Sequence, residues 1–229
     1  MKTRLIILLI VVSNNFTYSQ IIKSIGFKSG VTLSDQNWQH SEVTFEYFFN
    51  THASNYSVIN AVFIDKKHWE LFADLGVYQS SSKTEYNMYN YDVTQLGTPI
   101  ISSNANVNIG FITFSPAIKF KKQIKSFKPY VFIGPRIDYY YSGISNTNAN
   151  VFKDDFTKKP IWGFNVGEGI EYRIKNISIF AEYQFLYSYN YVIDKTIDDP
   201  SIALYYNISR ETLRTYTHVI SLGIKYHFK

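Results

Sequence analysis

Residues 214–229 read RTYTHVISLGIKYHFK, and their pattern decides the fold. From Tyr216 to Phe228 every second position carries an apolar or aromatic side chain, and His218 is the single exception. The apolar and aromatic residues are Tyr216, Ile220, Leu222, Ile224, Tyr226 and Phe228. The intervening positions carry smaller or polar side chains. A period of two predicts a β-strand with two different faces. An aromatic residue near the end of such a strand is typical of the closing strand of an outer-membrane barrel, whose outer face is apolar and whose interior is polar.

The first residues have the order of an export signal. Lys2 and Arg4 precede an apolar run over 5–12, and Thr17 and Ser19 are small residues placed for cleavage before Gln20. The run is much shorter than the about 20 residues that a membrane-spanning helix needs. A buried N-terminal strand or helix is the alternative. We expect a signal peptide over 1–19 and one barrel domain over 20–229, located in the outer membrane of a Gram-negative cell.

Composition narrows the classes of function. The chain has 229 residues, with 23 Lys and Arg against 18 Asp and Glu, and two of the basic residues lie in the predicted signal. The remaining excess of positive charge is too small to argue for nucleic acid. The absence of cysteine excludes a disulfide scaffold and thiolate metal sites. Beyond 5–12 no apolar run could form a spanning helix, so a membrane-spanning form of this chain must be a closed barrel.

Eight segments alternate with a period of two, and the second is the least clear: 24–33, 56–64, 69–79, 107–121, 128–142, 161–174, 177–191 and 214–229. Short connections (65–68, 122–127 and 175–176) alternate with long ones (34–55, 80–106, 143–160 and 192–213). Outer-membrane barrels show this asymmetry, with short periplasmic turns and longer extracellular loops. The sequence therefore predicts an all-β protein, an eight-stranded antiparallel up-and-down transmembrane β-barrel.

Three residues fit this pattern badly. Pro116 and Pro135 lie within strands, where proline removes a hydrogen-bond donor, so we expect a bulge or an unpaired position at each. Alternation places Glu168 on the lipid face, where a carboxylate is costly. Either a bulge turns Glu168 inward, or the predicted register is wrong, or Glu168 faces a partner.

The predicted interior is charged. An eight-stranded barrel is just wide enough for side chains to fill it, and unpaired charges in such a space are costly. We therefore predict an ion-pair network with Arg136, bidentate to a carboxylate, at its centre. Its expected members are Lys28, Glu70, Asp74, Lys119, Arg136, Asp138, Glu171, Arg173, Glu182 and Lys225, with Lys121 also facing inward. The alternative is that several of these residues are solvated near the rims.

Aromatic residues gather at both ends of the predicted strands. Tyr139, Tyr141, Trp162, Tyr187, Tyr189 and Tyr216 lie toward the long connections, and Trp69, Phe120, Tyr130, Tyr172, Tyr226 and Phe228 toward the short ones. Two belts are what the two interfaces of a bilayer favour. A general preference of aromatics for strands would explain their number but not their placement.

Motifs for catalysis or cofactor binding are missing from the sequence. None of the five histidines has a second ligand at metal-binding spacing, and no nucleophile motif or phosphate-binding glycine loop occurs. We predict no catalytic residue, no metal and no cofactor, although some barrels of this size are lipid-modifying enzymes. The segment 86–92 is rich in aromatics, and Tyr86, Tyr89 and Tyr91 are candidate contacts for a protein or glycan. An unspecialised Tyr/Asn-rich loop is the alternative.

Five segments are similar to a known family: 26–31 (GFKSGV), 69–78 (WELFADLGVY), 128–135 (KPYVFIGP), 163–172 (GFNVGEGIEY) and the closing 222–228 (LGIKYHF), although Lys229 follows the last aromatic. On these segments the chain resembles the porin-like, PorT-like outer-membrane β-barrel family of Gram-negative bacteria. The resemblance covers most of the chain after the predicted signal, and it implies an eight-stranded barrel. Most members have no assigned activity, and one branch assists protein secretion.

We expect a monomeric barrel in outer-membrane lipid, with a filled lumen, that acts as a structural or interaction protein through long extracellular loops and binds no nucleic acid. The alternatives are a porin-like channel for small solutes, a lipid-active enzyme, a PorT-like secretion accessory protein and a soluble lipocalin-like barrel.

Overall fold

A computed structural model of the chain describes residues 21–40, 43–48, 50–89, 99–146, 159–196 and 210–228. The predicted signal over 1–19 lies outside these residues. Within them, no helix has the length and apolar character needed to cross a membrane. Every regular element that is described is a β-strand, and the bounds are β1 (Ser24–His40), β2 (Val43–Phe48), β3 (Asn50–Asp65), β4 (Trp69–Tyr89), β5 (Pro99–Lys121), β6 (Phe127–Asn146), β7 (Ile161–Ile174), β8 (Ile177–Ser188), β9 (Ile193–Thr196) and β10 (Arg210–His227).

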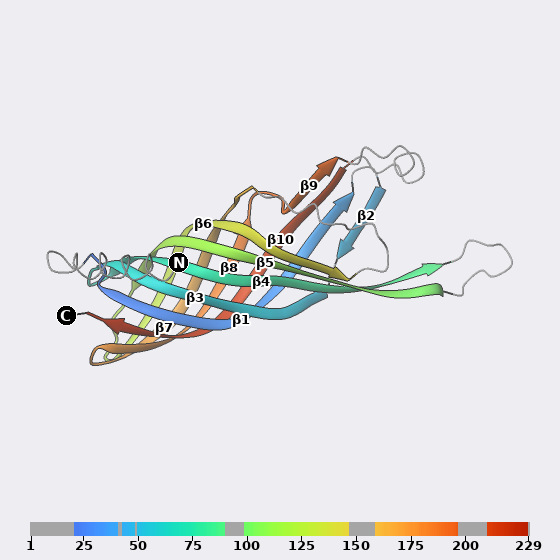
Figure 1. The fold of residues 1–229 in the computed structure, drawn as a ribbon. Helices are drawn as coiled ribbons and strands as arrows, with labels where there is room; N and C mark the ends of the chain where they lie inside the picture. The colour runs from blue at the N-terminus through green and yellow to red at the C-terminus, as the bar shows by residue number, and fades with distance from the viewer. Residues whose placement is uncertain are drawn as a thin grey trace, which may run out of the picture.

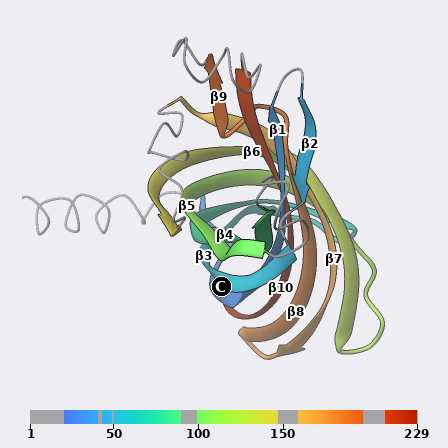
Figure 2. The same ribbon diagram turned by 90° about the vertical axis from the view of Figure 1, so that its right-hand side faces the viewer.

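The sheet closes on itself. Eight strands follow one another around the wall in the order β1-β3-β4-β5-β6-β7-β8-β10, each antiparallel to its neighbours, and β1 pairs with β10 to complete the ring (Figure 1). Figure 2, which faces the end where the strands are longest, shows the wall curving around its axis. The predicted eight-stranded antiparallel barrel is therefore confirmed. β2 and β9 stand outside the ring, because they pair only with the far ends of β1 and β10.

The two faces of the wall divide the side chains as the alternation predicts. The large side chains of the outer face form an exposed band of Val, Ile, Leu, Phe, Tyr and Trp, of which Leu222 is 67% exposed. Charged and polar side chains of the inner face are buried, and Arg136 is 1% exposed. An apolar exterior around a polar interior is the pattern of a barrel that lipid surrounds.

One end of the barrel is built from the short connections. Residues 66–68, 122–126 and 175–176 join β3 to β4, β5 to β6 and β7 to β8. Lys125 and Lys175 adopt a left-handed backbone conformation in two of these turns, each with φ of 54°. The short turns therefore lie where the spacing of the segments predicts them.

At the other end, much of the sequence predicted as long loops forms strands instead. β1 continues to His40, β4 to Tyr89 and β6 to Asn146, while β3 begins at Asn50 and β5 at Pro99. β4 and β5 are 21 and 23 residues long, although a tilted strand needs only about 9–11 residues to cross a bilayer. The prediction of loops over most of 34–55 and 80–106 was wrong, because the hydrogen-bonded ladder continues beyond the apolar band.

The extended strands separate into two groups. β1 leaves β3 after Ser34 pairs with His52, and β10 leaves β8 beyond the pairing of Tyr216 with Tyr187. Beyond these points, on the side away from the short turns, a small separate sheet is formed by β2, β1, β10 and β9. Figure 1 shows this sheet diverging from the β4–β5 hairpin, which projects to the right.

Pro116 and Pro135 mark a gap in the wall. Pairing between β5 and β6 runs to Phe114 opposite Ile137 and resumes at Ile118 opposite Ile133, so the two prolines face each other. Neither can donate across the gap. The register is the same on both sides of the gap, and the Ser115 hydroxyl lies 3.3 Å from the Pro135 carbonyl oxygen, to which it donates. The prediction of an unpaired position is confirmed, and one gap accounts for both prolines.

Candidate functional site

The interior contains a cluster of charges around Lys28. Its ammonium group lies 2.7 Å from an Asp74 oxygen and also pairs with Glu182, and all three side chains are buried. Asp74 accepts a second hydrogen bond from the Asn60 amide at 2.7 Å. Glu182 accepts from Tyr130 at 3.0 Å and from Gln184 at 2.6 Å. Each buried carboxylate is therefore both ion-paired and hydrogen-bonded, as burial of a charge requires.

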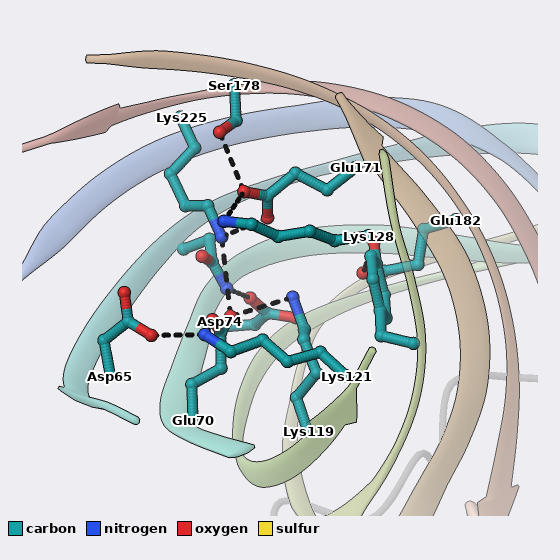
Figure 3. A network of polar contacts seen from close by, with 12 residues as sticks. Asp65, Glu70, Asp74, Lys119, Lys121, Lys128, Glu171, Ser178, Glu182 and Lys225 are labelled. Atoms are coloured by element: carbon teal, nitrogen blue, oxygen red, sulfur yellow. Dashed lines mark hydrogen bonds and ion pairs between the residues drawn. The ribbon is translucent and has the colours of Figure 1, made fainter. Parts of the chain in front are cut away.

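A second cluster lies toward the short turns (Figure 3). Lys225 joins two carboxylates, with its nitrogen 3.4 Å from Glu70 and 2.7 Å from Glu171. Lys119 and Lys121 also contact Glu70, at 3.2 and 2.8 Å. Glu171 is further contacted by Lys128, Ser178 and His227. The cluster links side chains from β4, β5, β6, β7, β8 and β10, so it ties opposite parts of the wall together.

Aromatic rings fill the space between the charges. The Lys119 nitrogen lies 4.1 Å from the centre of the Tyr130 ring and 4.8 Å from that of Phe72, which are cation–π contacts. Glycines of the inner face make room for such rings. A Cβ atom at Gly223 would lie 2.3 Å from Phe180, and one at Gly167 would lie 2.4 Å from Phe132. Alternation of small and large inward residues is how small barrels fill their interior.

Arg136 is not at the centre of the network. Its Nε atom lies 2.9 Å from one Asp138 oxygen, and an Nη atom donates to Ser188 at 2.8 Å. Asp138 also accepts from Tyr78 at 2.8 Å. The prediction that Arg136 is bidentate to a carboxylate was wrong, because only one of its nitrogens contacts Asp138. The network is centred on Lys28, Glu70 and Glu171 instead.

Apolar side chains seal the interior on the side of the extended strands. Val192 and Ile193 follow β8 and pack against Leu213 of β10. They belong to one buried cluster with Tyr56, Val58, Tyr78, Val107, Ile109, Phe111, Ile161, Leu186 and Val219. The interior thus has a charged layer toward the short turns and an apolar layer (the residues of this cluster) toward the extended strands, and the Arg136–Asp138 ion pair borders the apolar layer at Tyr78.

The remaining predicted positions fall in other places. Arg173 lies beside a turn, where its Nε atom donates to the Lys175 carbonyl oxygen, so it stands apart from the network. Tyr86 and Tyr89 lie in strand β4 and not in a loop, and Tyr91 lies outside the described residues. Tyr130 is buried in the lumen, so its predicted place in a lipid-facing belt was wrong. Its parity with Arg136 was the signal that could have placed it inside.

Sequence reasoning missed several polar partners of the network, notably Asn60, Lys128 and His227. Lys128 and His227 share the inward parity of Arg136 and Lys225, so alternation could have found them. Among the described residues no group of three or more His, Asp or Glu side chains could hold a metal ion.

No protein-family profile and no characterised relative matches the chain. Solved structures do share its fold. The outer membrane protein OprG of Pseudomonas aeruginosa superimposes with a TM-score of 0.53 at 10% identity, over 90% of this chain and 97% of OprG. The outer membrane protease OmpT of Escherichia coli gives 0.48 at 8% identity (90% and 96% covered). The E. coli outer membrane protein W gives 0.37 at 13% identity (92% and 100% covered).

The chain has the fold of an outer-membrane β-barrel. The comparison with OprG, the one of the three above a TM-score of 0.5, carries this statement, and at 10% identity it shows the fold alone.

Proposed function

We propose that the protein resides in the outer membrane of a Gram-negative cell, after export by its signal, and acts there as an interaction protein through its extended strands. In this proposal the barrel anchors the protein in the membrane. The protein binds its partner without a cofactor and catalyses no reaction. The partner is a protein or a glycan outside the cell.

One observation carries the proposal: the lumen of the barrel is filled with side chains, while strands β4 and β5 extend beyond the barrel wall. The inward side chains of both layers have almost no accessible surface, including Lys28, Arg136, Ile109 and Leu213. A water-filled pore would leave such side chains accessible, which disfavours the porin-like channel. Meanwhile β4 and β5 continue past the ends of their neighbours, since β3 begins opposite Lys83 and β6 ends opposite Asn106. Among the described residues, no strand pairs with β4 beyond Lys83 or with β5 before Asn106 on the outer sides of this hairpin, and such an edge is a surface to which another strand can add.

A shortened hairpin tests the proposal. Lys83 pairs with Asn106, so replacing 84–105 with Asn-Gly forms a two-residue turn that suits a β-hairpin. We expect a barrel that still folds, as judged by heat-dependent migration on a gel, but loses binding in glycan-array and cell-surface crosslinking assays. A shortened barrel that keeps every interaction and surface phenotype of the parent would contradict the proposal.

The same variant tests for a PorT-like secretion role, which predicts loss of secreted proteins from the medium. Two measurements on the parent protein test for a lipid-active enzyme and for a soluble barrel. Turnover of lipid by the purified barrel would indicate the enzyme, and release of the protein from cells without detergent would indicate the soluble barrel.

A further inference from the structure

Three polar side chains lie together on the outer face, within the apolar band. They are Glu168 on β7, Tyr183 on β8 and His218 on β10. Along β7, Glu168 stands between the exposed Val166 and Ile170, and along β10, His218 is followed on the same face by the exposed Ile220. An ionisable side chain at this depth is costly in lipid, and it marks a functional site with a partner to be found.

The register excludes two of the three explanations that the sequence left open for Glu168. Pairing of β7 with β6 and with β8 continues without a shift, and Glu168 lies opposite Val131 and Tyr183. No bulge turns the side chain inward, and it is exposed on the outer face. A partner in the membrane is the explanation that remains.

The face offers one acceptor and one donor. The Tyr183 hydroxyl lies 2.7 Å from Nδ1 of His218. The proposal takes the tautomer in which the Tyr183 hydroxyl donates to Nδ1 and the ring hydrogen lies on Nε2, so that His218 presents an N–H group to the membrane. The Glu168 carboxylate can only accept when it is ionised. In the part of the chain that the structure describes, neither Glu168 nor Nε2 of His218 has a hydrogen-bond partner.

We propose that this face binds a second copy of the chain, with Glu168 of each copy accepting a hydrogen bond from His218 of the other. β8 lies between β7 and β10 in the wall, so the acceptor and the donor stand on either side of Tyr183. Such an arrangement is self-complementary: a two-fold axis near Tyr183 forms the same hydrogen bond twice, so that both groups of both copies are satisfied.

The shape of the face fits the same partner. A groove includes Glu168, Ala181, Tyr183, Ile220 and Leu222 in its lining, and His218 stands outside that lining. Ala181 lies between Ile170 and Leu222 in the sheet, and its small side chain allows close approach of a second wall. Close approach strengthens packing and hydrogen bonds where lipid supplies no hydrophobic driving force.

Disulfide crosslinking tests the pairing in native membranes, because the chain contains no cysteine. Ala181→Cys places a thiol in the groove, and Leu75→Cys places one on β4, four strands away around the wall. We expect oxidation to give a crosslinked homodimer with Ala181→Cys and a monomer with Leu75→Cys. Absence of crosslinking at both sites, equal crosslinking at both, or a product whose mass shows a different protein would each overturn the proposal.

Two substitutions test the donor and the acceptor. In vesicles, self-association followed by energy transfer between labelled barrels should weaken about tenfold or more for Glu168→Leu and for His218→Leu, since each change removes two hydrogen bonds of the dimer. The double variant should be little weaker than either single one. Val166→Ala, on the same face, should associate like the parent. Heat-dependent migration on a gel checks that every variant folds. Unchanged association of folded Glu168→Leu or His218→Leu, or purely additive losses, would refute the pairing.

Discussion

Lys28 illustrates how much the interior depends on single charges. It contacts Asp74 and Glu182 at once, and none of the three side chains reaches solvent. Lys28→Met should lower the free energy of unfolding by about 3–5 kcal/mol, because removal of one partner leaves buried carboxylates without compensation. Urea titration of the barrel in lipid vesicles, read from the folded and unfolded gel bands, measures this loss.

Lys128→Met is the matched control. Among the residues that the structure describes, Lys128 has one ion pair, at 3.5 Å from Glu171, and its side chain is 12% exposed. Its loss should cost about 1 kcal/mol or less, as for an ion pair close to solvent. Equal stability of the two variants would show that the Lys28 contacts contribute nothing particular.

The sequence could predict which face each of these residues occupies but not which residues meet. Alternation placed Lys28, Asp74 and Glu182 inside, because parity depends only on position along one strand. Contacts across the lumen depend also on the stagger between strands, which sets the height of each side chain. Because alternation does not give this height, Arg136 was predicted at the centre of the network. In the structure it lies at the height of Asp138, Ser188 and Tyr78 and contacts them.

At the scale of the strands, the facing prolines are the weakest part of the wall. Ladder pairing is absent from 115–117 opposite 134–136, where the Ser115 hydroxyl takes the place of a backbone donor to the Pro135 carbonyl oxygen, and missing backbone hydrogen bonds are costly where lipid excludes water. The double variant Pro116→Val, Pro135→Val should restore two hydrogen bonds and raise the free energy of unfolding by about 1–2 kcal/mol. The same urea titration in vesicles measures the gain.

Pro129→Val provides the comparison, since Pro129 lies at the base of β6, outside the gap. It should change stability less than the double variant does. A double variant no more stable than the parent would mean that the wall tolerates the gap without cost.

The strand extensions were beyond the reach of the sequence pattern. Alternation arises from the contrast between lipid on one face and a packed lumen on the other. Beyond the apolar band that contrast ends, and in 84–89 (TEYNMY) only Glu85 to Met88 alternate, a run too short to predict that the segment forms part of β4. Backbone hydrogen bonds hold these segments in strands, and such bonds leave no periodic signal in the side chains.

At the scale of the whole molecule, the two layers of the interior follow one another along the barrel axis, and each of them fills the lumen. The charged layer around Lys28, Glu70 and Glu171 lies toward the short turns, and the apolar layer around Ile109 and Leu213 lies toward the extended strands. Strand number predicts a filled lumen. It does not predict that the filling changes from ionic to apolar along the axis, because β9 and the segment before it, which complete the apolar layer, belong to a predicted loop.

A lumen that two layers close should conduct ions only when both layers are removed. The parent barrel in planar bilayers should show no single-channel steps, because either layer alone blocks ions. A variant without the charged layer (Lys28→Ala, Asp74→Ala and Glu182→Ala together with Glu70→Ala, Glu171→Ala and Lys225→Ala) should stay closed, since the apolar layer still excludes hydrated ions. A variant of the apolar layer (Phe111→Ala, Ile161→Ala, Leu213→Ala) should stay closed as well, because the ion-paired side chains still fill their part of the lumen.

Conductance should appear when both sets of substitutions are combined in a barrel that still shows heat-dependent migration. Steps from the parent or from a folded variant of one layer would mean that the lumen conducts, and would restore the channel as the better account of this protein.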